Sequence, residues 1–268
     1  MNQTPEPPAP PPLPANPPRP VPSRRKPDEL IPMEEGTGMG SAIASLLKAP
    51  GSILYELMTG TRAAKLNISL LLLTLTGLLA FGVVTGSISW GQQLWIAPAK
   101  ITGGLLFASL ICLPSLYIFA ALSGMALRLS AIAGMLLSTT ALTALLVAGF
   151  TPLIWVFGQS TASHAFMGGL ILVLWLFSLV FGMNLLVKCA RALGMTDAMH
   201  LRIWCFMFLL VTLQMSCALR PIIGTAKTFF PEDKKFFLQH WADSINAETG
   251  KGPKSAATRP SGENPYVD

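Results

Sequence analysis

The 268-residue chain has no aspartate or glutamate between Glu56 and Asp197, a stretch of more than half its length. Carboxylates supply most general acid/base pairs, divalent-metal ligands and proton relays in proteins. Their absence argues against an enzyme, a metal or other cofactor site, and an ion-coupled carrier. Only 12% of the residues are charged and 51% are hydrophobic. This composition is typical of a membrane protein rather than a soluble domain.

The chain also has few cysteines and no cluster of basic residues typical of nucleic-acid binding. Four cysteines lie inside or beside apolar segments with no Cys-x-x-Cys pair, which favours packing over a disulfide or zinc site. The formal net charge is +6, but the basic residues stand at the ends of apolar segments and form no stripe interleaved with aromatics. We therefore expect these charges to face a membrane surface and not nucleic acid.

What is present is a series of five apolar stretches, each close to the roughly 20 helical residues that cross a hydrocarbon core. Inside lipid a helix satisfies its own backbone hydrogen bonds, so helices are expected. The fold class predicted is all-α, a polytopic five-helix transmembrane bundle with flanking amphipathic helices. The predicted spans are Leu66–Val84, Ala99–Leu122, Leu127–Phe150, Phe166–Val187 and Ile203–Leu219.

The remaining segments complete the predicted domain organisation. Residues 1–40 form a disordered cytoplasmic tail, and twelve prolines in residues 1–27 suit either a solvated spacer or a ligand for a proline-binding soluble partner. Helical spacing of apolar residues, restarted at Pro50, predicts two interfacial helices over 41–60. The transmembrane domain covers 61–222, an interfacial helix 223–247 and a disordered tail 248–268.

Lysine and arginine predict the orientation. They precede the first span and fill the second and fourth connections, whereas the first and third connections contain only Lys100. By the positive-inside rule the N-terminus is cytoplasmic, and five spans then place the C-terminus outside. The location expected is the bacterial inner membrane, or an endomembrane if the chain is eukaryotic.

Small residues mark candidate helix contacts. Ser130, Gly134 and Ser138 share one face of the third span, and Ala120 and Gly124 extend the pattern on the second. Such faces allow helices to approach closely, so the two spans are expected to form a tight hairpin. An internal contact and self-association both remain open, with internal packing preferred.

Three other positions stand out within the spans. Pro114 is expected to kink the second span, because it frees a backbone carbonyl. Asn184 and Gln214 are the main intramembrane amides and are expected to bond across helices or to backbone.

The run Leu47-Lys48-Ala49-Pro50-Gly51-Ser52-Ile53-Leu54, followed by five closely spaced spans, resembles the Yip1 domain family. The resemblance covers 41–219 and implies a non-enzymatic polytopic protein, which in eukaryotes associates with small GTPases and transport vesicles. The acidic Asp-Leu-x-Gly-Pro type motif of the eukaryotic members is missing, so no family residue is carried over. Leu46-Leu47-Lys48-Ala49 also resembles an actin-binding WH2 element.

These observations predict a Yip1-like membrane scaffold, or organising and trafficking protein, that contacts the lipid bilayer and other membrane proteins or itself. The alternative is a small channel or carrier for an uncharged or anionic solute, with a water-filled path lined by Ser, Thr, Asn184 and Gln214. An enzyme is not expected, because nothing supplies a nucleophile, a base and an orienting group together.

Overall fold

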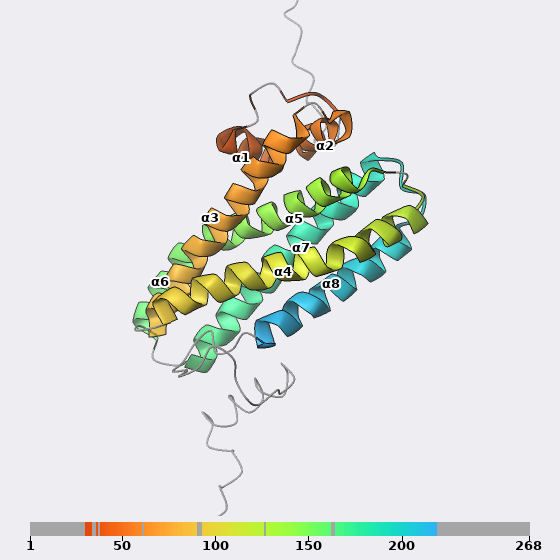
Figure 1. The fold of residues 1–268 in the computed structure, drawn as a ribbon. Coiled ribbons are helices and arrows are strands. Elements are labelled where there is room, and N and C mark those ends of the chain that lie inside the picture. Colours follow the sequence, from red (N-terminus) through yellow and green to blue (C-terminus); the bar gives the residue numbers. More distant parts are fainter. Residues whose placement is uncertain are drawn as a thin grey trace, which may run out of the picture.

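The computed structural model describes residues 30–33, 36, 38–60, 62–89, 93–125, 127–161 and 164–218, and every regular element within these ranges is an α-helix (Figure 1). The elements are α1 (Met39–Lys48), α2 (Pro50–Thr59), α3 (Ala63–Ser89), α4 (Gln93–Leu122), α5 (Leu129–Gly149), α6 (Thr151–Ser160), α7 (His164–Ala192) and α8 (Ala198–Ala218). The predicted tail up to residue 29, the predicted helix 223–247 and the predicted tail 248–268 lie outside the described residues.

The prediction of an all-α membrane bundle with five spans is confirmed. Five helical segments are long and apolar enough to cross a membrane, and each of them extends beyond the predicted bounds at one end or both. The segments are Ala63–Ile88, Leu94–Leu122, Leu129–Ser160, Phe166–Ala192 and Ala198–Met215. The predicted bounds stop beside a charged residue, a threonine or a proline, but the helices continue through these residues, which are Lys65, Thr85, Pro98, Thr151, Lys188 and Arg202.

The third span differs most from its prediction. A loop is predicted after Phe150, but α6 continues the helical path from Thr151 to Ser160. Pro152 lies in the first turn of α6, where its missing N–H costs nothing and its fixed φ suits a helix start. The apolar residues that follow keep α6 packed on α3 and α7.

The five spans run alternately up and down, so the start of α3 and the end of α8 lie at opposite ends of the bundle (Figure 1). Helix α3 packs on α4 and α5, α4 also packs on α8, and α5 on α7. Helix α5 is the centre of the bundle. Of its most apolar window 67% is buried, compared with 28% to 44% for the other four spans.

Helices α1 and α2 cover the end of the bundle where α3 begins (Figure 1). The sequence predicts them as amphipathic interfacial helices over 41–60. The structure instead directs the apolar face of α2 into the protein: Ile53, Leu54 and Leu57 are at least 95% buried, and α2 contacts α3, α5 and α7. The end of the bundle thus offers these side chains a protein surface.

Candidate functional site

The predicted small-residue face of the third span is divided between two environments. Gly134 and Ser138 are buried, and the Ser138 hydroxyl donates to the Gly134 carbonyl at 2.8 Å. A Cβ added to Gly134 would overlap the side chain of Leu57 in α2 and lie 3.0 Å from Asn67 Oδ1 in α3. The glycine thus lets α2 and α3 approach α5, which makes this an internal contact.

Ser130 does not belong to that contact. It is exposed in the first turn of α5, so the predicted three-residue face is reduced to two positions. Helices α4 and α5 form a hairpin joined by a short turn, but they are not packed tightly on each other, because α4 packs mainly on α3 and α8, and α5 mainly on α3 and α7.

Gly124 is likewise not on a helix face. It lies in the turn after α4 at φ 87°, where the Met125 N–H donates to the Ala120 carbonyl at 3.1 Å. This is a helix-ending turn that favours glycine, because a Cβ is strained at positive φ. Ala120 itself is buried at the end of α4.

A contact that the sequence did not predict joins the two turns at this end. Both the backbone N–H and the hydroxyl of Thr196, in the α7–α8 turn, donate to the Ser123 carbonyl, at 3.2 and 3.1 Å. A Cβ at Gly124 would lie 2.6 Å from Thr196 Oγ1. The α4–α5 and α7–α8 connections are therefore held against one another.

Pro114 lies inside the continuous helix α4, as does Pro98, which the prediction places before the span. Beside Pro114, the Ser115 hydroxyl donates to the Cys112 carbonyl at 2.8 Å and accepts a hydrogen bond from Trp204 Nε1 at 3.0 Å. The residue after the proline therefore ties α4 to α8. Trp204 is 1% exposed, and no periodicity in the sequence indicated this partner.

The closest helix crossings involve glycines other than those predicted from the sequence. A Cβ at Gly82 in α3 would overlap the backbone of Pro98 in α4, and one at Gly77 would lie 2.9 Å from the Ala144 carbonyl oxygen in α5. Gly182 in α7 is similarly tight against Thr139 and Thr143. Glycine within an apolar span was the available signal, although glycine also occurs in spans with open surroundings, as at Gly169.

The two intramembrane amides are not between the helices. Asn184 in α7 and Gln214 in α8 are both exposed, so they face away from the protein and not across an internal interface. This corrects the expectation that they bond to neighbouring helices within the bundle. Their exposure could not be predicted from their spacing, because α7 and α8 have apolar residues on all sides.

Hydroxyl groups inside the bundle are directed back to their own helices. Each of the following buried side chains donates to the carbonyl four residues earlier at 2.8 to 3.0 Å: Thr74, Thr85, Ser109, Ser138, Thr139, Thr143, Ser178 and Thr212. Such bonds satisfy the hydroxyl without a partner helix or water. These groups hold helical backbone and do not line an open path.

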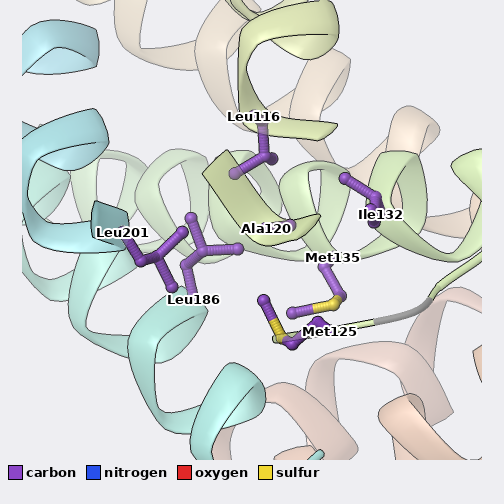
Figure 2. Close-up of a pocket in the computed structure, with 7 residues that line it drawn as sticks. All are labelled: Leu116, Ala120, Met125, Ile132, Met135, Leu186 and Leu201. Carbon is purple, nitrogen blue, oxygen red and sulfur yellow. The ribbon is translucent and has the colours of Figure 1, made fainter. Parts of the chain in front are cut away.

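A small cavity of about 10 Å³ lies near the α4–α5 turn. Its seven lining side chains are all apolar, and Figure 2 shows the thioethers of Met125 and Met135 beside one another with Leu186 and Leu201 opposite. Sites for small molecules usually exceed 300 Å³ and add a few polar groups. The cavity has neither property.

Lys100 is the one described cation that is buried, with 2% of its surface exposed in the third turn of α4. The other seven described lysines and arginines are exposed and gather at the opposite end of the bundle, around α1, α2 and the two joined turns. They are Lys48, Arg62, Lys65, Arg128, Lys188, Arg191 and Arg202. We call this set the basic end.

Among the residues that the structure describes, no three His, Cys, Asp or Glu side chains come together as a group able to hold a metal ion. Cys112, Cys189 and Cys205 are buried within the spans. Comparison of the chain with protein-family models, curated proteins and solved structures found no match.

Proposed function

We propose that this integral membrane protein is a non-enzymatic scaffold that organises its surroundings through its surfaces. The observation that carries the proposal is a contrast within one molecule. Eight buried hydroxyls of the interior are bonded to their own helices, whereas seven exposed cations gather at the basic end. Chemistry available to partners is therefore at the surface.

The basic end suits two kinds of negatively charged neighbour. Anionic headgroups attract each nearby lysine or arginine by roughly 1 kcal/mol, and acidic segments of soluble proteins offer the same charge. Glu56 is 3% exposed, so of the acids described at this end only Asp197 is at the surface. We place this end in the cytoplasm, where the positive-inside rule puts clustered basic residues.

Two further parts of the proposal rest on the chain as a whole. Two short helices followed by five spans support a Yip1-like assignment and a role in membrane organisation or trafficking. The proline-rich residues 1–27 enter the proposal as a docking segment for a soluble partner, because polyproline helices lose little entropy on binding. The bacterial inner membrane, or a eukaryotic endomembrane, is the location proposed.

A specific observation favours a second function, a carrier for an anionic solute. Lys100 places a cation inside the bundle, and intramembrane cations commonly mark substrate paths. Within the described chain, Thr102 Oγ1 and Trp175 Nε1 are also buried without a hydrogen-bond partner. Both atoms could donate to an anion.

One flux experiment separates the two functions. Purified full-length protein is reconstituted in vesicles, and the release of chloride, phosphate and glycerol is compared with protein-free vesicles. A scaffold gives no increase for any of the three. Anion release that is lost in Lys100→Met, kept in Lys100→Arg and kept in the exposed control Lys65→Met would establish the carrier and contradict the scaffold.

A further inference from the structure

Four of the helices form two hairpins, α4–α5 and α7–α8, and the two hairpins make equivalent contacts with each other. The first helix of each hairpin packs on the second helix of the other: α4 packs on α8, and α7 packs on α5. Each hairpin turns at a glycine in the left-handed region, Gly124 and Gly194, and the two turns are bonded through Thr196 and Ser123. Helices α5 and α8 are therefore equivalent, because each is the second helix of its hairpin.

The two equivalent helices differ in how they are covered. Helices α2 and α3 lie over α5, whose most apolar window is 67% buried. No described helix occupies the corresponding place on α8, and its window is only 28% buried. Among the described residues, α8 therefore has one side with no helix against it, and its window is as little buried as that of α4.

The sequence of α8 on that side is a single stripe. Its exposed apolar residues recur at helical spacing and are Met199, Ile203, Phe206, Met207 and Leu210. Gln214 continues the stripe and is exposed as well. Counted from the two turn glycines, Gln214 is at the position of Ala144, the residue of α5 against which Gly77 of α3 packs. Ala144 is thus buried in a helix contact, whereas the equivalent residue of α8, Gln214, is polar and exposed.

Gln214 faces away from the protein within the fifth span, Ala198–Met215. It lies three helical turns beyond Arg202, about 18 Å along the helix axis at 1.5 Å per residue. If Arg202 marks the inner edge, Gln214 is well inside a hydrocarbon core of roughly 30 Å. An amide facing lipid lacks hydrogen-bond partners, so it gains when another helix supplies them.

The glutamine in the exposed stripe of α8 indicates what kind of helix would pack there. A glutamine side chain carries both a donor and an acceptor, so it is complementary to a second glutamine related to it by a two-fold axis. An axis along the membrane normal also places each apolar position of α8 near its own copy. We propose that α8 forms the interface of a homodimer, in which the Gln214 side chains of two copies hydrogen-bond to each other.

The proposal is independent of whether the protein is a scaffold or a carrier, and cysteine cross-linking in native membranes tests it. Leu210→Cys and Leu79→Cys are compared in a full-length chain whose four native cysteines are replaced by alanine. The two leucines are similarly exposed, at 44% and 42%, but Leu79 lies on α3. Leu210→Cys is expected to give the disulfide dimer, and Leu79→Cys is not. Equal dimer yields would mean random collision and would overturn the proposal.

The amide is tested on the Leu210→Cys background. Gln214→Leu removes the hydrogen bonds from an exposed position, so the fold is retained and the dimer yield is expected to fall about three- to ten-fold. Asn184→Leu, which removes an exposed amide from α7, is the matched control and leaves the yield unchanged. Equal yields with and without Gln214 would contradict the proposed pair.

Two further measurements distinguish a second copy from a different occupant of the α8 stripe. Single-molecule bleaching of the chain with its native cysteines is expected to show two copies, and mostly one copy for Gln214→Leu. If the dimer forms only after residues 219–268 are deleted, that segment covers α8 in the intact chain. If bleaching finds one copy while α8 cross-links to a different protein, the occupant is not a second copy. Either result would reject the homodimer.

Discussion

At the scale of single residues, small side chains decide how near the helices come. Gly77, Gly82, Gly134 and Gly182 each lie where a methyl group would meet a neighbouring helix. In a membrane the hydrophobic effect does not drive helices together, so close van der Waals contact and interhelical hydrogen bonds must do so. The glycines therefore contribute to stability through the approach that they permit.

Gly82→Ala is expected to destabilise the bundle, because the new Cβ would overlap the backbone of Pro98, which cannot rotate away. Overpacking of this kind typically costs about 1–3 kcal/mol. The free energy of unfolding in mixed detergent micelles measures it. Gly169→Ala is the matched control: it has open space around its Cβ, so it should be neutral or stabilise by up to about 1 kcal/mol. Equal effects of the two substitutions would contradict the close crossing.

At the scale of elements, α2 acts as a cap on the bundle. Pro50 starts the helix, Gly60 ends it at φ 77°, and the apolar residues between them face α3, α5 and α7. Ten residues form too short a helix to be stable alone in water, so tertiary packing must hold α2 in place.

Leu54→Ala is expected to release α2 while the five spans stay folded. Leu54 is 1% exposed, and truncating a buried leucine costs about 2–5 kcal/mol, which is a large part of what a short helix gains by docking. Hydrogen–deuterium exchange should rise across Pro50–Thr59 and remain unchanged in α5 and α7. Leu47→Ala in α1, where the leucine is 58% exposed, should leave exchange as it is. Unchanged exchange in Leu54→Ala would show that α2 is held by other means.

At the scale of the whole molecule, exposed positive charge differs between the two ends of the bundle. The basic end collects exposed cations from α1, α3, α7, α8 and the α4–α5 turn, which are far apart in sequence. At the other end the described cation, Lys100, is buried. This difference makes one end of the bundle suited to anionic lipid.

The double variant Arg128→Gln, Arg191→Gln is expected to lose stabilisation by anionic lipid. Both arginines are exposed at the basic end, and each contributes roughly 1 kcal/mol near a negative surface. The melting temperature in phosphatidylglycerol nanodiscs minus that in phosphatidylcholine nanodiscs should be smaller for the variant. Added salt should reduce the difference for the natural chain as well, because it screens exposed charges. A difference unaffected by the variant would exclude these arginines from lipid contact.

The sequence by itself determined the solvent and the class of this protein. Long apolar runs without carboxylates can only be helices in lipid, and both their number and the restart at Pro50 could be read from composition and spacing. These properties depend on each segment alone, so they need no knowledge of its neighbours.

Only the tertiary structure decided which side of each span is inside. Lipid and protein interior are similarly apolar, so an intramembrane helix has apolar residues all round and lacks the polar face that orients a soluble helix. For this reason Gly134 and Ser130 looked alike in sequence, as did Lys100 and the other cations, and the outward position of Gln214 could not be predicted. The acid-free spans determined where the chain resides, and packing determined which few polar groups remain for a partner.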